Sequence, residues 1–109
     1  MIYKTTEKTS RAIKIFIEEG GQEIARAYIY IIFNGLHDEP YALLEDVFVN
    51  EKYRGQGHGK EIIKAAIEEA KKQGCYKLIG TSRYEREKVH NLYSGLGFED
   101  YGKEFRINL

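Results

Sequence analysis

The chain has few of the residues that stabilise small secreted domains. Its 109 residues include one cysteine, one proline and no tryptophan. The single cysteine, Cys75, excludes an internal disulfide and gives no sign of an extracellular scaffold. No signal-peptide pattern opens the chain, and no stretch approaches the ~18 uninterrupted apolar residues of a membrane span. We therefore expect one cytoplasmic domain over residues 1–109, with no membrane partner.

The chain also has no excess of charge of either sign. Its 17 basic residues balance 17 acidic ones, whereas nonspecific nucleic-acid binding requires a basic surplus. No spacing of histidine, cysteine or carboxylate side chains resembles a metal site. We therefore expect no nucleic-acid partner and no metal, and an anionic ligand would have to be held by local geometry.

Hydrophobic periodicity predicts a mixed α/β fold. Early segments alternate apolar and polar residues at the period of half-buried strands, and Gly20-Gly21 predicts a hairpin between the first two. Apolar residues then recur at helical spacing until Gly74, which is placed to end a helix. A strand–helix–strand unit requires a parallel strand pair, so we expect a central mixed β-sheet flanked by helices. The expected elements are a frayed lead-in or short edge strand over 1–10, strands over 11–19, 23–33 and 41–49, a helix up to Gly74, a strand over 76–81, a helix over 87–96 and one or two strands over 98–109.

A glycine-dense turn, Arg54-Gly55-Gln56-Gly57-His58-Gly59, directly precedes the first expected helix. Glycines let main-chain N–H groups approach a ligand closely, and a helix N-terminus directs free N–H groups and partial positive charge at the same place. The turn therefore predicts a phosphate or pyrophosphate site, with positive charge from Arg54 and Lys60. The spacing matches neither the dinucleotide fingerprint nor the phosphate loop of nucleotide triphosphatases. A tight structural turn is the alternative.

The segment from Glu45 to Gly59 resembles the acetyl-CoA motif of the GNAT N-acetyltransferase superfamily, an apolar strand followed by R-G-x-G-x-G/A at a helix start. The segment from Val89 to Phe98 resembles the family's A-x-x-[FL]-Y-x-x-x-G-F signature, with valine in place of the usual small residue. The resemblance covers about residues 11–109 and implies a GNAT-like acyl-CoA N-acyltransferase fold. It also implies that the usual first two helices are missing, because only about ten residues precede the first expected strand.

The resemblance implies roles for two groups of main-chain atoms. Those of Val47, Phe48 and Val49 would pair with the pantetheine arm, and a main-chain N–H on this strand would stabilise the tetrahedral intermediate. Val47 and Val49 are equally well explained as core residues. The N–H groups of Gly55, Gln56, Gly57, His58, Gly59 and Lys60 would bind the pyrophosphate, and Asn91 would contact the cofactor.

Two side chains are candidate catalytic groups. By resemblance, Tyr93 protonates the leaving thiolate of CoA, and a phenol with a pKa near ~10 is protonated at neutral pH; a core tyrosine is the alternative. An alkyl ammonium, with a pKa near ~10.4, must lose a proton before it attacks, and Glu45 is the candidate base, acting through a water molecule. Asp46 is expected on the other face of the strand, where it caps a turn or pairs with a base such as Arg83 or Arg86.

These residues predict an acetyl-CoA-dependent N-acetyltransferase that transfers the acetyl group directly, in a ternary complex, to a primary amine on a small molecule or peptide. Acidic residues near the expected mouth favour a cationic amine: Glu45, Asp46, Asp38 and Glu39. The acceptor pocket would be open, or completed by a second copy of the chain in a homodimer. The alternatives are a non-catalytic acyl-CoA-binding or sensing module, including a partner-dependent subunit, and a purely structural domain.

The remaining reactive side chains are expected to play minor parts. Cys75 is expected to be a buried, inert thiol, so an acyl-cysteine relay is not expected. His90 lies three residues before Tyr93 and is expected to serve as a hydrogen-bond partner, and His58 is expected to be solvated.

Overall fold

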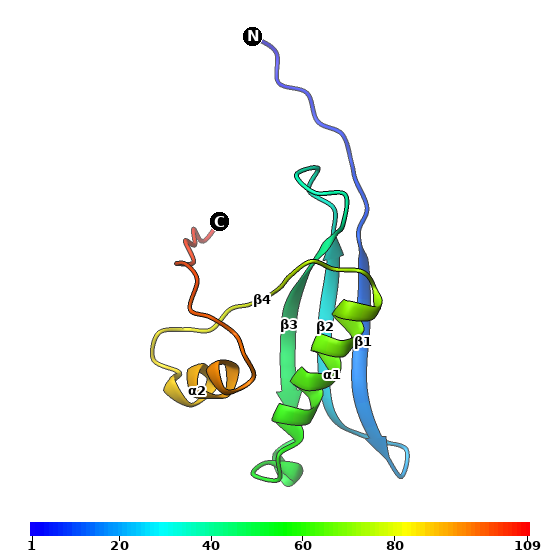
Figure 1. Cartoon of the computed structure of the whole chain (residues 1–109), viewed down its shortest axis with the longest axis vertical. Coiled ribbons are helices and arrows are strands. Elements are labelled where there is room, and N and C mark those ends of the chain that lie inside the picture. Colours follow the sequence, from blue (N-terminus) through cyan, green and yellow to red (C-terminus); the bar gives the residue numbers. More distant parts are fainter.

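The computed structural model describes all 109 residues and contains one four-stranded sheet, two α-helices and a 3-10 turn (Figure 1). The predicted order of elements is confirmed as far as the second helix, and residues 1–10 form neither helix nor strand. No helix is both long enough and apolar enough to cross a bilayer. The elements are β1 (Arg11–Glu19), β2 (Gln22–Ile32), β3 (Tyr41–Val49), η1 (Glu51–Tyr53), α1 (His58–Lys72), β4 (Leu78–Gly80) and α2 (Glu87–Gly95).

The sheet is mixed, as predicted, with strand order β1-β2-β3-β4. β1 and β2 form an antiparallel hairpin that turns at Gly20 and Gly21, whose φ angles of 60° and 77° are left-handed. β2 and β3 are also antiparallel, whereas β3 and β4, which α1 connects, are parallel. The glycine pair and the connecting helix therefore set the two kinds of strand pairing that the sequence indicated.

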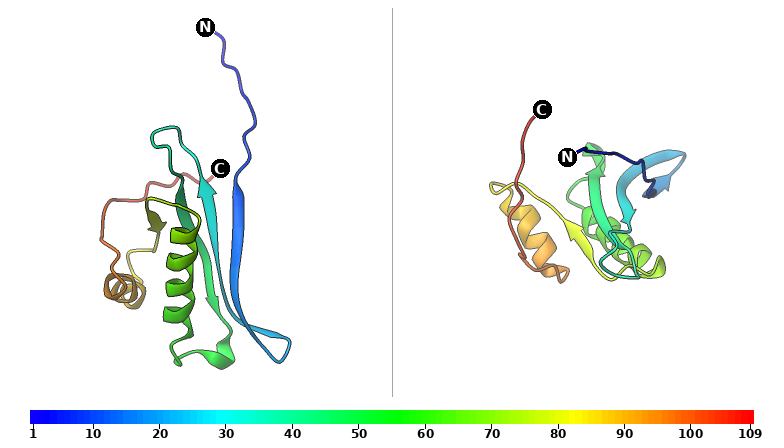
Figure 2. Two further views of the ribbon diagram at one scale, coloured as in Figure 1. Left: turned by 45° about the vertical axis from the view of Figure 1, so that its right-hand side comes forward. Right: turned by 90° about the horizontal axis from the view of Figure 1, so that it is seen from above.

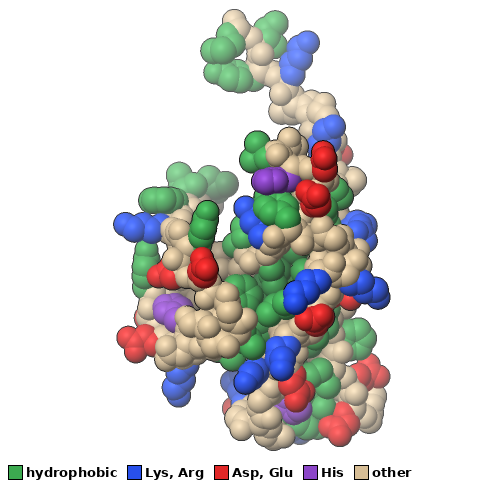
Figure 3. Space-filling model, in the orientation of Figure 1, with side chains coloured by type: hydrophobic (Ala, Val, Ile, Leu, Met, Phe, Trp, Pro, Cys, Tyr) green, Lys and Arg blue, Asp and Glu red, His purple; other side chains and the backbone are tan.

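The core lies between one face of the sheet and α1, which packs along that face (Figure 2). The other side of α1 is exposed and carries interspersed basic and acidic side chains (Figure 3). No helix covers the opposite face of β1, β2 and β3, because α2 lies beyond β4 (Figure 2); we call this uncovered surface the open face. The buried apolar residues are Ile24, Ala25, Ala27, Ile29, Ile31, Ala42, Leu44, Ile62, Ile63, Ala66 and Ala70.

The prediction of strands over 98–109 is wrong, because no residue after α2 belongs to a strand. The alternation is real, and Tyr101, Phe105, Ile107 and Leu109 are each at least 81% exposed. Alternation predicts which side chains share a face, but a strand also needs a neighbour that accepts its main-chain hydrogen bonds. The adjacent edge strand, β4, is only three residues long, about half the length expected from the sequence.

Candidate functional site

A β-bulge in β3 determines which side chains reach the open face. Arg26 pairs with Phe48 and Tyr28 pairs with Glu45, so one residue of β2 lies opposite two residues of β3. The extra residue reverses the side-chain alternation. Glu45 and Phe48 are both exposed, whereas Val47, between them, packs against the core. Without the bulge, Phe48 would point toward α1.

Asp46 occupies the bulge and is the only non-glycine residue with a left-handed φ, at 49°. Arg26 holds it with two hydrogen bonds, from Nε to Oδ2 at 2.9 Å and from Nη2 to Oδ1 at 3.3 Å. Asp46 thus pairs with a base, as expected, but the partner is Arg26 on the adjacent strand, within bidentate reach, and not Arg83 or Arg86. Sequence reasoning missed Arg26, since nothing local to the bulge points to a residue twenty positions earlier.

β3 and β4 pair over only three residues each, and then separate. Ala42, Leu43 and Leu44 align with 78–80, after which the chain leaves β4 toward α2 (Figures 1 and 2). The rest of β3, from Glu45 to Val49, therefore has no strand partner on that side. Such an edge offers main-chain donors and acceptors to an extended ligand.

Tyr93 of α2 lies against the end of β4, where the two strands separate. A Cβ added to Gly80 would be 3.3 Å from Tyr93 Cε2 and 3.6 Å from its hydroxyl oxygen, so a larger residue there would displace the phenol. Phe98 supports the Tyr93 ring from another side, with centroids 5.0 Å apart. Sequence reasoning missed Gly80, although a glycine within a short apolar strand often marks close approach of another group.

Tyr93 packs against Gly80, and Gly80 pairs with Leu44, the residue that precedes Glu45. Burial first, and the carboxylate of Glu45 second, raise the pKa of the Tyr93 phenol above its ordinary value. Both causes act in the same direction, because each disfavours a phenolate. Tyr93 therefore lies at the point where the unpaired edge of β3 begins, and Glu45 is the first residue of that edge.

The glycine turn leaves the N-terminus of α1 open to a ligand. Gly55 and Gly57 have left-handed φ angles of 77° and 87°, and Gly57 is the N-cap of α1, with no side chain to accept a first-turn N–H. A side chain at either glycine would meet nothing within 4 Å. Free N–H groups beside open space fit an anion such as a pyrophosphate.

The charged side chains of this turn are arranged around the same end of α1. Arg54 Nε donates to the Val49 carbonyl at 3.0 Å, which fixes the guanidinium at the end of β3, while Lys60 is exposed in the first turn of α1. His58 is not solvated as expected. Its side chain is only 21% exposed, and buried Nδ1 has no hydrogen-bond partner, because the ring packs edge-on against Tyr53.

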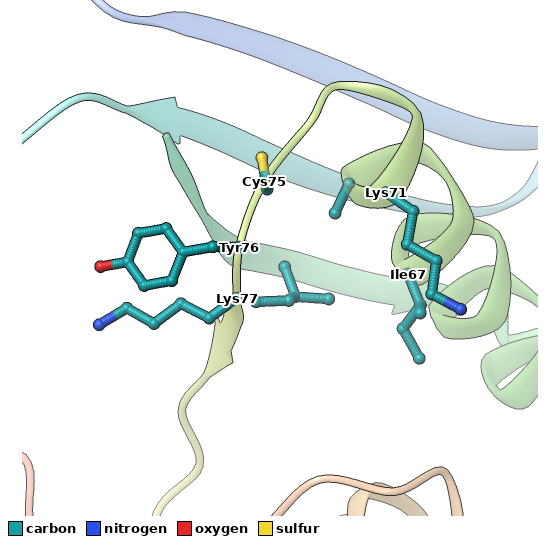
Figure 4. Close-up of a pocket in the computed structure, with 7 residues that line it drawn as sticks. Ile67, Lys71, Cys75, Tyr76 and Lys77 are labelled. Carbon is teal, nitrogen blue, oxygen red and sulfur yellow. The ribbon is translucent and has the colours of Figure 1, made fainter. Parts of the chain in front are cut away.

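Three further residues singled out in the sequence are His90, Asn91 and Cys75. His90 Nε2 lies 2.8 Å from the Arg83 carbonyl, the hydrogen-bond role expected for it, and Asn91 is exposed on α2. Cys75 is half-buried, and burial raises the pKa of its thiol, which disfavours the reactive thiolate. It borders an apolar hollow of about 180 Å³ between the C-terminal end of α1 and the segment leading into β4 (Figure 4). This hollow is at the opposite end of α1 from the glycine turn.

The chain, including the glycine turn and the Tyr93 helix, also matches known proteins over most of its length. Residues 3–98 match the model of the acetyltransferase (GNAT) family. The chain belongs to this family. The sequence resemblance is therefore confirmed, and so is the mixed-sheet fold that it implied.

Relatives of known activity cover different shares of this GNAT chain. A glucosamine 6-phosphate N-acetyltransferase of Trypanosoma brucei brucei is 39% identical over 66 residues, which are 61% of this chain and 43% of that protein. An aminoglycoside N(6')-acetyltransferase type 1 of Serratia marcescens is 33% identical over 78 residues, 72% of this chain and 52% of that protein. The chain thus spans about half the length of the curated relatives it matches.

Solved structures share the fold of this GNAT chain over most of its length. The crystal structure of a Trypanosoma brucei acetyltransferase has a TM-score of 0.79 at 29% identity. The match covers 90% of this chain and 69% of the Trypanosoma brucei chain. An aminoglycoside N-acetyltransferase in complex with CoA has a TM-score of 0.72 at 23% identity, covering 88% of this chain and 74% of that one. At that identity, the second likeness concerns the fold alone.

Proposed function

We propose that this chain is an acetyl-CoA-dependent N-acetyltransferase that transfers the acetyl group directly to a primary amine. The observation that carries the proposal is the position of Tyr93 against Gly80, which pairs with Leu44 at the start of the unpaired β3 edge that Glu45 begins. That edge leads toward the glycine turn at the N-terminus of α1. An elongated thioester with an anionic far end fits this arrangement, which family membership independently favours.

The cofactor end of the site depends on main-chain groups. The N–H groups of 55–60 bind the pyrophosphate, and Arg54 and Lys60 add charge nearby. The pantetheine arm pairs with the main chain of β3 at Val47 and Phe48. The Val49 carbonyl already accepts Arg54 Nε, so Val49 contributes less than its neighbours, and Asn91 approaches the cofactor from α2.

The chemistry requires the acceptor nitrogen to lose two protons and the departing sulfur to gain one. Glu45 accepts the proton of the bound ammonium through a water molecule, which frees the nitrogen lone pair to attack the thioester carbon. A main-chain N–H of β3 stabilises the resulting oxyanion. The nitrogen of the intermediate loses its remaining excess proton to solvent, the C–S bond breaks, and Tyr93 donates its phenolic proton to the departing sulfur. Solvent then reprotonates Tyr93. Because the amine attacks the thioester directly, no acyl-enzyme forms.

The names of the relatives support an amine acceptor. They include acetyltransferases of glucosamine 6-phosphate, aminoglycosides and thialysine, and each of these acceptors carries an amine. We propose that the present chain likewise acetylates an amine of a small molecule or peptide. A non-catalytic acyl-CoA-binding module is the second candidate, because the open face has no helix to wall an acceptor pocket.

Calorimetry with CoA and a thiol-release assay over an amine library separate the two candidates. We expect CoA to bind and to raise the stability of the protein, by about 2.7 kcal/mol at 100 times its Kd, and we expect thiol release with at least one amine. Binding without turnover of any amine would support the module instead. No binding would leave a structural domain and end the enzymatic proposal.

Substitution Glu45→Gln tests the base. We expect kcat/KM for an alkyl amine to fall about tenfold at pH 7, since solvent can replace an exposed base in part. The deficit should shrink as the pH approaches ~10.4, where the free amine loses its own proton. Measured pH profiles of both proteins check this, and a deficit independent of pH would remove Glu45 from proton transfer. Glu39→Gln, at an exposed position in the loop before β3, is the matched control.

A further inference from the structure

Glu23 and Asp46, two carboxylates of the open face, are paired with cations, whereas Glu45 is not. Lys14 pairs with Glu23, and Arg26 pairs with Glu23 and Asp46. Two cations therefore balance two carboxylates. Glu45, although directly opposite Tyr28 in the β2–β3 register, makes no ion pair and no side-chain hydrogen bond. Glu45 is therefore the carboxylate of this face that no side chain pairs with, and one further cation, Arg54, lies over the Phe48 ring, 5.6 Å from its centroid.

The aromatic rings of the same face also divide into rings that have a cation over them and rings that do not. Lys14 Nζ lies 5.0 Å from the Phe16 ring centroid, and Arg26 Cζ lies 4.6 Å from that of Phe48. No cation of the chain lies over Tyr28 or Tyr30, whose rings are nearly parallel, with centroids 6.5 Å apart. Tyr30 is 38% exposed. The two rings without a cation are therefore adjacent to the carboxylate without one.

We propose that Tyr28, Tyr30 and Glu45 form the acceptor site, and that this site takes a linear alkyl amine with a second positive charge. The inference rests on the proposed acetyl transfer, and it adds the class of acceptor. Glu45 engages the ammonium that reacts, and the two tyrosine rings hold the distal ammonium by cation–π attraction.

The register sets the size of this acceptor. Tyr30 lies two residues beyond Tyr28 along β2, a step of about 7 Å, so four to six methylene groups between the nitrogens suit the span. An anionic distal group would face Glu45 and the negative faces of both rings, which disfavours it. The acidic loop residues Asp38 and Glu39, expected near the mouth, lie beyond the other end of β3 from the bulge (Figure 1). The carboxylate on β3 is therefore the local source of selectivity.

Four amines of matched length test the proposal in the thiol-release assay: 1,5-diaminopentane, pentylamine, 5-aminopentanol and 6-aminohexanoate. We expect kcat/KM for the diamine to exceed that for pentylamine by about fivefold, the scale of one or two exposed cation–π contacts, and the carboxylate to be the poorest acceptor. Tyr30→Leu should bring the diamine-to-pentylamine ratio toward one, mainly through KM. Tyr30→Phe should preserve the ratio, because its ring remains.

Phe16→Leu removes another exposed ring of the open face and should leave the ratio unchanged, which makes it the matched control. CoA affinity, measured by calorimetry, reports that each variant is folded. A wild-type ratio near one, or a ratio that Tyr30→Leu does not change, would overturn the acceptor site while leaving the acetyltransferase intact.

If no amine is turned over, the proposed function fails, and calorimetric titration of 1,5-diaminopentane still decides the site. Weaker diamine binding by Tyr30→Leu than by Tyr30→Phe supports the site, and equal binding refutes it. If light scattering shows that wild type is a dimer which Tyr30→Leu dissociates, then a second copy covers the rings and the acceptor proposal is wrong.

Discussion

Replacing Tyr93 with phenylalanine is expected to lower kcat about 100-fold and to leave the Kd for CoA unchanged. The variant keeps the ring that packs against Gly80 and Phe98 and loses only the hydroxyl that protonates the departing sulfur. A positioned general acid contributes at least about this factor. Steady-state kinetics by thiol release, together with calorimetry of CoA binding, measure the two quantities separately.

The pH dependence of the wild-type enzyme provides a second readout for Tyr93. Burial and then the Glu45 carboxylate raise the pKa of the phenol, so the acid stays protonated to higher pH than a free tyrosine. We expect no loss of kcat attributable to this acid below about pH 10. Tyr84→Phe, on an 80% exposed tyrosine before α2, controls for general effects of removing a phenol. Full activity of Tyr93→Phe would exclude this residue as the acid.

The parts of the fold that depend on neighbouring residues were predictable from the sequence. The alternation over β1, the glycine pair between β1 and β2 and the helical spacing of α1 each report a local preference. The glycine turn was readable for the same reason, because Gly55 and Gly57 adopt angles that other residues avoid. The prediction of Tyr93 as a catalytic residue depended on the match to a family signature, since its spacing alone is equally typical of a core tyrosine.

The parts that depend on distant residues were not predictable. At the bulge, Asp46 is bound twice by Arg26 on another strand, and the bulge changes which side of β3 faces the core. Residues 98–109 have the pattern of a strand, but that pattern does not predict whether a strand edge is available to pair with them. Gly80 is important only because a helix later in the chain places a phenol against it.

Substitution Gly57→Val is expected to weaken CoA binding about 30-fold. Gly57 has a φ of 87°, and a β-branched residue there costs roughly 1–3 kcal/mol. The turn must relax to another conformation, which moves the N–H groups of the first turn of α1 away from the pyrophosphate. A loss of about 2 kcal/mol corresponds to this ratio of dissociation constants. Because Tyr93 and Glu45 belong to other elements, kcat at saturating acetyl-CoA should change little.

Gly35→Val separates the cost of backbone strain from the loss of an anion site. Gly35 has a similar left-handed φ of 76°, and a side chain at either glycine meets nothing within 4 Å, but Gly35 lies in the loop before β3, away from α1. Both variants should lose stability in thermal unfolding, because valine disfavours a left-handed φ at either position. Only Gly57→Val should lose CoA affinity. Equal losses of affinity would mean that general destabilisation weakens binding. Wild-type affinity in Gly57→Val would show that the diphosphate is held elsewhere. If the amides of this turn bound it, the altered turn would lose those hydrogen bonds and the affinity would fall.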